Sequence, residues 1–424
     1  MAADGTKRFF ASAGLAVLAG VVCGVSAALF LFLLDRATEV RVAHEGLVFA
    51  LPVAGLLLGT VYERWGARVK GGNNLVIDTV HDGGPHIPLR MAPLVLFGTI
   101  VTHLFGGSAG REGTAVQMGA SLSDAIAHRV KVSARTRRDL LLAGIAGGFG
   151  AVFGTPFAGA LFAMEVVTLG RIEFASLVPV LIAAAVGDWV TRHLGIVHTL
   201  YPHVSAPLFQ ASILWKLAVI GVASAAASAF FIELTHAIKR WSERAIPRLP
   251  FRMALGGLGV IVMWKVIGTS DYLGLGVPTI LRAFSDPTLP NYAFLAKLTF
   301  TALTLGVGFI GGEVTPLFFV GAALGSVTAR WLQMPIDLGA AVGLAAVFGA
   351  SANAPLSLSL MVGELVGLEV VPYVLVATMI AHRMSGHRSI YPSQRIARTK
   401  PFSRAIGRTV VLRDFTGREG PTEK

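Results

Sequence analysis

A short glycine-rich stretch holds the residues best placed to do chemistry. Gly110-Arg111-Glu112-Gly113-Thr114 lies between two long uncharged apolar runs, where an ionised side chain is costly and usually functional. Glycines let a backbone turn sharply and expose its amides, and a helix N-terminus attracts anions. We therefore expect Gly110, Arg111 and Gly113 to form an anion site that Glu112 occupies or guards.

Glu112 also has the chemistry of a proton-coupled gate. A deprotonated carboxylate can hold an anion position, whereas a protonated one can withdraw and admit the anion, so exchange results. Burial and helix amides act on the protonation of a carboxylate in opposite senses, which keeps such a group titratable. The alternative is a structural salt bridge with Arg111, which is disfavoured because adjacent residues on a helix seldom face each other.

The elements that position these residues are membrane helices. The chain has 424 residues, 54% of them hydrophobic and 14% charged, against about 25% charged in soluble domains. Its mean hydropathy is +0.68. Uncharged runs at 9–34, 91–110, 140–164 and 338–363 reach the roughly 20 residues that cross a bilayer as a helix. We predict an all-α multi-pass membrane protein.

The charge distribution fits a membrane partner rather than nucleic acid. The net charge is +12, but Lys and Arg cluster between apolar runs, at 129–138 and in the tail after Tyr391. By the positive-inside tendency we expect that tail to be cytoplasmic. The single Cys23 excludes a disulfide within one chain and a zinc cluster.

An internal repeat organises the chain. Residues 72–76 match 274–278 and residues 110–119 match 312–321, both at an offset of 202, while 151–165 match 350–364 at an offset of 199. We predict two homologous halves, at about 9–195 and 212–391, followed by a basic tail at 392–424 without a regulatory domain. Many apolar stretches are broken by Gly and Pro, which predicts re-entrant helices and a binding place at the seam near the bilayer midplane.

These motifs resemble the CLC family of anion channels and anion/proton antiporters. The likeness covers residues 71–391. Gly110-Arg111-Glu112-Gly113 matches one loop of the family, Gly312–Pro316 stands where the family has Gly-x-Phe-x-Pro, and Tyr391 stands at the place of a late central tyrosine. The resemblance implies two inverted repeats with broken helices, and a homodimer with one pathway per protomer.

The departures from the family pattern are informative. Asn73 replaces a serine that faces the anion, Thr114 replaces a proline, and the Phe-containing loop carries Glu313 and Thr315 instead. This set resembles the prokaryotic branch of fluoride/proton antiporters. The inner proton-transfer glutamate of chloride antiporters aligns with Val166, which cannot carry a proton.

The resemblance and the chemistry together assign roles to these residues. Fluoride needs short, well-directed donors, and an Asn side chain supplies two N–H groups, so we expect Asn73 to bind the anion. The amides near Val314 and Thr315, the Thr315 hydroxyl and the Tyr391 phenol would complete the site, and Glu313 would replace the missing inner proton carrier. Two alternatives remain. Asn73 could serve a turn, and Glu313 and Thr315 could cap a helix.

Three other buried ionisable groups are expected to be structural. Glu165 and Glu364 end matching apolar segments, and we interpret them as helix-end or interface carboxylates. His103, in an apolar run, is more often a hydrogen-bonded core histidine than a proton relay.

The predicted function is export of fluoride in exchange for protons by a bacterial inner-membrane protein, with fluoride, protons and lipid as its partners. A chloride/proton antiporter or chloride channel is the alternative. No enzyme motif such as His-Glu-x-x-His or Gly-x-Ser-x-Gly is present, so we expect no enzyme, no cofactor and no metal.

Overall fold

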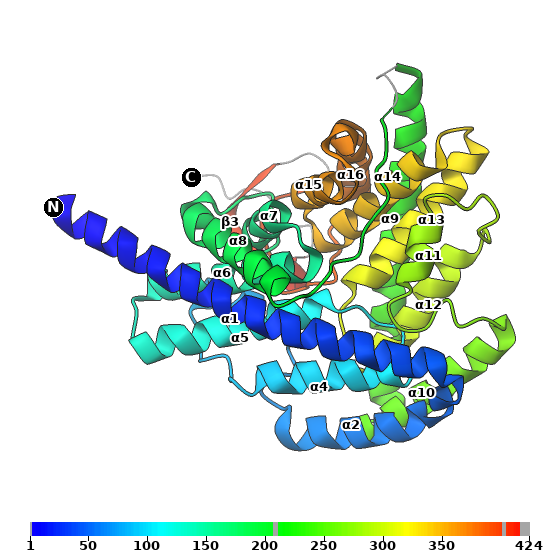
Figure 1. Cartoon of the computed structure of the whole chain (residues 1–424), viewed down its shortest axis with the longest axis horizontal. Coiled ribbons are helices and arrows are strands. Elements are labelled where there is room, and N and C mark those ends of the chain that lie inside the picture. Colours follow the sequence, from blue (N-terminus) through cyan, green and yellow to red (C-terminus); the bar gives the residue numbers. More distant parts are fainter. Residues whose placement is uncertain (1, 207–210, 401–403, 416–424) are drawn as a thin grey trace.

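The computed structural model describes residues 2–206, 211–400 and 404–415 (Figure 1). In this part of the chain sixteen α-helices account for most residues. The first eight are α1 (Ala2–Ala43), α2 (Leu51–Trp65), α3 (Asn73–Asp82), α4 (Met91–Leu104), α5 (Glu112–Val130), α6 (Ala134–Phe153), α7 (Pro156–Glu165) and α8 (Leu177–His193). The second eight are α9 (Ala211–Ala245), α10 (Leu249–Ile267), α11 (Val277–Arg282), α12 (Ala293–Gly306), α13 (Val314–Trp331), α14 (Ile336–Ala352), α15 (Pro355–Val366) and α16 (Val371–Met384).

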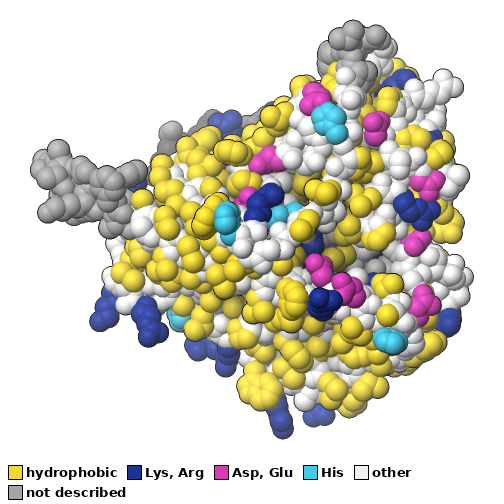
Figure 2. Space-filling view, viewed as in Figure 1, with side chains coloured by type: hydrophobic (Ala, Val, Ile, Leu, Met, Phe, Trp, Pro, Cys, Tyr) yellow, Lys and Arg dark blue, Asp and Glu magenta, His cyan; other side chains and the backbone are white. Residues whose placement is uncertain are grey.

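The surface is that of a membrane protein. Five helical segments are long and apolar enough to cross a bilayer: Ser12–Ala43, Glu45–Trp65, Phe174–His193, Ala211–Ala245 and Leu249–Ile267. Hydrophobic side chains cover much of the face in Figure 2. Such a continuous apolar surface is unfavourable in water, so the predicted multi-pass helical fold is confirmed.

The two halves repeat the same local structure. Helices α5 and α13 begin 202 residues apart, and α7 and α15 begin 199 apart, each at a proline. Gly72 and Gly274, which precede α3 and α11, both have φ +53°. The left-handed residue that ends α6 is Gly154 and the one that ends α14 is Asn353. The internal repeat inferred from short motifs is therefore a repeat of helix ends and turns.

Three of the four long apolar runs are not single spanning helices, which corrects the sequence prediction. Helix α4 ends at Leu104, so the run at 91–110 is too short to span as helix. The runs at 140–164 and 338–363 each break in two, because the chain turns left-handed at Gly154 or Asn353 and a proline then opens a new helix. The half-length helices predicted from Gly and Pro are confirmed.

Helices α7 and α15 cap each other across the two halves. The Glu364 carboxylate, near the end of α15, accepts hydrogen bonds from the amides of Phe157 (3.2 Å) and Ala158 (2.7 Å) at the start of α7. In return Glu165, the last residue of α7, accepts from the amides of Leu356 (3.0 Å) and Ser357 (2.8 Å). Each carboxylate satisfies helix N-terminal amides that otherwise lack a partner, as expected for interface carboxylates.

This reciprocal capping predicts a stability effect. Glu364→Ala leaves two amides of α7 without their acceptor, so we expect it to lower the free energy of unfolding by about 1–3 kcal/mol. Thermal unfolding in detergent checks this, with Glu39→Ala as the control, because Glu39 pairs only with Arg36 on the exposed surface. Equal melting temperatures for the two variants would show that the caps contribute nothing.

A small sheet joins the tail to the helices, a feature that the sequence analysis missed. Strand β1 (Thr168–Leu169) pairs in parallel with β2 (Arg395–Arg398), and β2 pairs antiparallel with β3 (Ala405–Val411). Arg395 also forms an ion pair with Asp82 at the end of α3, with N–O distances of 2.7 Å. The tail is thus attached to the helix that begins with Asn73.

Candidate functional site

Glu112 lies at the start of α5 with its carboxylate against the start of α13. The Thr315 amide donates to one carboxylate oxygen at 3.1 Å and the Thr315 hydroxyl donates to the other at 2.5 Å. The Arg111 amide adds a third bond at 3.1 Å. Glu112 has no exposed surface. Its carboxylate therefore occupies an anion position at a helix N-terminus.

Paired glycines bring the two halves together at this point. Gly110 and Gly312 exchange both backbone hydrogen bonds, with N–O distances of 2.6 and 2.8 Å. A Cβ on Gly312 would lie 2.7 Å from the Gly113 nitrogen, and a Cβ on Gly110 would lie 2.9 Å from Cδ of Pro316. Only glycine permits this approach, which places the start of α13 within reach of Glu112.

The ion pair between Arg111 and Glu112 is present, contrary to the argument against it. Nε of Arg111 lies 3.5 Å from Oε1 of Glu112. The pair was disfavoured because two adjacent helical residues seldom face each other. Arg111, however, is the residue before α5, with φ −111°, so its side chain can turn toward Glu112. The shorter bonds of Glu112 still go to Thr315, so the ion pair does not account for where the carboxylate sits.

Asn73, Gly113 and Glu313 meet on one side of Glu112. A Cβ on Gly113 would lie 3.0 Å from Nδ2 of Asn73 and 3.6 Å from Oε2 of Glu313. The Asn73 oxygen and that Glu313 oxygen are both buried without a hydrogen-bond partner. Buried polar atoms without partners are uncommon, and two acceptor oxygens mark this place as one that can take up a proton or a hydrogen-bond donor.

Asn73 and its neighbour Asn74 have different tasks. The Asn74 side chain accepts a hydrogen bond from the Ser393 amide at 3.0 Å and so ties the tail to α3. Asn73 makes no side-chain bond that caps α3, and Gly72 provides the turn with φ +53°. Both asparagines lie within α3, so the turn interpretation applies to Gly72 alone.

The capping alternative for Glu313 and Thr315 is wrong as stated. Glu313 precedes α13 but makes no side-chain cap, and the Thr315 hydroxyl donates to Glu112. The amide of Thr315 is satisfied from the other half of the chain, by Glu112. Val314, the first residue of α13, is buried beside them.

Tyr391 lies at the inner end of this group. Its side chain is 4% exposed and lines the same cavity as Asn73 and Glu313. The Ser389 hydroxyl accepts from the Tyr391 amide at 2.9 Å and fixes the backbone. All the residues predicted for the site thus gather around the start of α5 and α13.

Two cavities approach Glu112. The one we call the inner cavity has a volume of about 650 Å³ and is lined by Asn73, Glu313 and Tyr391, together with Arg413 of the tail. The one we call the outer cavity has a volume of about 370 Å³ and is lined by Arg111 among others. Glu112 is absent from the described lining of both cavities. It lies between them, because Arg111 before it lines the outer cavity and Gly113 after it lies against Asn73 and Glu313 of the inner cavity.

The sequence analysis missed the charged groups of the inner cavity. Lys239, Glu243 and Arg252 line it, and Arg252 donates to the Val307 carbonyl at 3.1 Å. The available signal was the position of Arg252 inside the apolar helix α10, because a charge within a membrane helix usually faces a cavity. The described lining holds four cationic side chains against three carboxylates: Lys70, Lys239, Arg252 and Arg413 against Glu63, Glu243 and Glu313. This positive balance favours the entry of an anion.

Glu165 and His103 are structural, as predicted. Glu165 caps α15 through the amides of Leu356 and Ser357 and is not among the described residues that line the inner cavity. His103 is fully buried, and its ring nitrogens contact the carbonyls of Thr99 (2.7 Å) and Ala109 (3.0 Å). It supports the loop that leads to Gly110.

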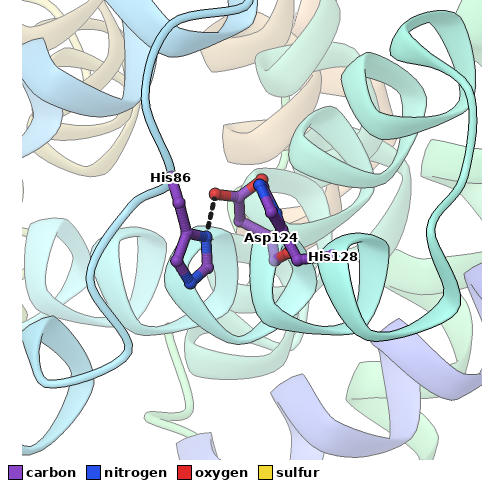
Figure 3. A group of neighbouring side chains, drawn as sticks. All are labelled: His86, Asp124 and His128. Carbon is purple, nitrogen blue, oxygen red and sulfur yellow. Dashed lines mark hydrogen bonds and ion pairs between the residues drawn. The ribbon is translucent and has the colours of Figure 1, made fainter.

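A second polar cluster lies apart from this site (Figure 3). His86, Asp124 and His128 have the composition of a metal site. However, Arg137 already binds both Asp124 oxygens, at 2.6 and 3.1 Å, and the Ile87 amide donates to one of them at 2.8 Å. A guanidinium held there disfavours a second cation. The cluster fastens the loop before α4 to α5 and α6.

Comparisons with known proteins identify relatives along nearly the whole chain. The model of the family described as voltage gated chloride channel matches residues 54–386. A Pseudomonas syringae pv. tomato protein described as a chloride/fluoride channel protein is 42% identical, over 91% of this chain and 86% of its own. A Ralstonia nicotianae protein described as a putative chloride channel protein, ClcB-like, is 29% identical over 81% of this chain and 83% of its own.

Solved structures share the fold. A CLC-type fluoride/proton antiporter superposes with a TM-score of 0.89 at 33% identity, covering 92% of this chain and 98% of the other. A slow cyanobacterial Cl⁻/H⁺ antiporter superposes with a TM-score of 0.77 at 18% identity, covering 88% and 94%. At that identity the second comparison supports the fold alone.

Proposed function

Because the chain belongs to the voltage gated chloride channel family, whose members include anion/proton antiporters and anion channels, we propose that it exchanges fluoride for protons and so exports fluoride. The observation that carries this proposal is the place of Glu112. Its carboxylate fills the amide and hydroxyl site at the start of α13, between the inner and the outer cavity.

The exchange follows from competition for one site. While Glu112 is charged, it holds the Thr315 amide and hydroxyl and blocks the passage. A proton on the carboxylate removes that charge and weakens both bonds, because bonds to ionised groups are about twice as strong as neutral ones. The side chain then leaves, and an anion from the inner cavity takes its place. Loss of the proton toward Glu313 and the inner cavity then restores the charge of Glu112, and the returning carboxylate displaces the anion outward.

Selectivity for fluoride is supported by the kind of donors around the site. The Asn73 amide group lies against Gly113 beside the position of Glu112, and the Thr315 hydroxyl already binds a carboxylate oxygen at 2.5 Å. Both are small, strong donors that suit a small and strongly hydrated anion. Two relatives, one described as a chloride/fluoride channel protein and the other as a fluoride/proton antiporter, agree with this choice.

Glu313 supplies the inner part of the proton path in this proposal. One of its oxygens is buried without a partner, and its side chain lines the inner cavity. Glu313 therefore borders the inner cavity on one side and lies close to Gly113, the residue after Glu112, on the other. In this proposal Glu313 takes the role of the inner proton-transfer glutamate of chloride antiporters, whose position is occupied by Val166 in this chain.

Ion efflux from proteoliposomes tests the proposed selectivity. Vesicles loaded with fluoride or with chloride are diluted into an anion-free buffer, and an ion-selective electrode records each efflux. We expect fluoride to leave at least about tenfold faster, a difference of about 1.4 kcal/mol in the barrier. Equal fluxes would favour the chloride alternative on the same fold.

Asn73→Ser is expected to reduce the preference for fluoride by about tenfold, because one N–H donor beside the anion is lost and each such bond contributes about 0.5–1.5 kcal/mol. The same efflux assay gives the ratio of fluoride to chloride flux. Asn291→Ser is the control, since Asn291 only accepts a hydrogen bond from Arg330 at the surface. An unchanged ratio in Asn73→Ser would remove Asn73 from the selectivity mechanism.

A further inference from the structure

A third cavity, separate from the transport site, lies where the tail meets the ends of the helices. Its volume is about 240 Å³, and it is bounded by the end of α7, by α16 and by the turn at 398–400. It shares no described lining residue with the inner or the outer cavity. We call it the tail cavity.

The tail cavity carries an excess of positive charge. Arg171, Arg383, Arg398 and Lys400 line it. Glu165 is the one carboxylate in its described lining, and both of its oxygens are taken by the amides of α15. Outside that lining, the Glu173 carboxylate lies 3.6 Å from Nε of Arg171, so the cationic side chains of the cavity still outnumber these two carboxylates.

Lys400 is a buried basic group of this cavity rather than a surface residue at its border. It is 6% exposed, and its ammonium donates to the Ser385 hydroxyl at 3.1 Å. Burial lowers the pKa of Lys400 to about 7, since no carboxylate compensates the lost hydration. An ammonium has three donors, so further acceptors can be added in the cavity.

The tail cavity also has an apolar border. Leu169, Ile172, Leu356 and Met379 are among its lining residues, and Leu356 at the start of α15 is 37% exposed. Arginine forks are suited to phosphate oxygens, and clusters of basic groups attract anionic lipids.

We propose that the tail cavity binds a phosphate group, with Arg171, Arg398 and Lys400 as its donors. The chemistry is shared by the headgroup of an anionic phospholipid and by free phosphate. This inference does not depend on which ion the protein transports.

Lipid binding to the purified full-length chain tests the proposal. Native mass spectrometry compares retention of phosphatidylglycerol and of phosphatidylcholine by the wild type and by Arg171→Ala/Arg398→Ala. Both arginines are exposed, so the double variant should fold. The control is Arg129→Ala/Arg135→Ala, which removes equal charge from exposed positions outside the cavity.

We expect the wild type and the control to retain phosphatidylglycerol at least about tenfold better than the double variant does, with no difference for phosphatidylcholine. A calorimetric titration with inorganic phosphate separates the sources. Phosphate binding that the double variant loses, without a phosphatidylglycerol effect, supports a free phosphate ligand. If the double variant matches the control for both probes, the proposal is overturned.

Discussion

Glu112→Gln is expected to reduce fluoride-driven proton uptake by about 100-fold or more while the protein stays folded. Glutamine keeps the length of the side chain but cannot titrate, and a positioned acid–base group contributes about 10²–10⁴ in rate. It also places a donor N–H against the donor groups of Thr315, which now bind both carboxylate oxygens. The gate then loses both its proton and its hold on the anion position.

A pH electrode in a suspension of fluoride-loaded proteoliposomes measures this effect. The control is Glu45→Gln, because Glu45 lines the outer cavity but has no bond to α13. Elution volume and melting temperature show whether each variant is folded. Proton uptake at the wild-type rate in Glu112→Gln would remove Glu112 from proton transfer.

Glu313→Gln is expected to have the second largest effect, a loss of proton uptake of at least about 100-fold with fluoride efflux less affected. The Glu313 carboxylate lies between the inner cavity and Gly113 and has an oxygen without a partner. The substitution keeps its shape but blocks the inner half of the proton path. Anion entry depends instead on Asn73 and on the start of α13.

Paired recordings of fluoride efflux and proton uptake measure the two effects separately. Glu243→Gln is the matched control, since Glu243 lines the same cavity but sits near Arg252, 3.8 Å away, rather than beside Gly113. Should Glu313→Gln and Glu243→Gln both keep the wild-type ratio of protons to fluoride, the proton path runs elsewhere.

The place where the two halves meet could be predicted from the sequence, because glycine-rich motifs recur at a fixed offset. Gly110 and Gly312 lie at equivalent positions of the two halves, and the structure pairs them directly. That pairing alone brings Glu112 to the start of α13. The repeat of short motifs thus predicted that the two halves meet at a common seam. The contact found there between Glu112 and Thr315, 203 positions apart, was not itself predicted.

Helix breaks were harder to place from sequence. Residues 140–164 form one continuous apolar run, and composition alone favours a single spanning helix. The break depends on Gly154 adopting φ +73° just before Pro156. Gly154 and Pro156 could be seen in the sequence as a possible break. Whether the chain turns there also depends on the packing of α7 against α15, which is a contact between distant parts of the chain.

The contacts that individual side chains make were the feature hardest to predict from the sequence. Nothing in the sequence separates Asn73 from Asn74, and the difference depends on Ser393, more than three hundred residues away, whose amide binds Asn74. Likewise, the ion pair between Arg111 and Glu112 depends on where α5 begins. If α5 began one residue earlier, Arg111 would be helical and would not be expected to face Glu112.

The central claim is that one carboxylate and the transported anion compete for the same donors. The most direct test is the simultaneous recording of fluoride and protons in proteoliposomes that start with an outward fluoride gradient and equal pH on both sides. The account predicts that protons enter against their own developing gradient as fluoride leaves, in a fixed ratio. Fluoride efflux with no proton uptake would contradict it.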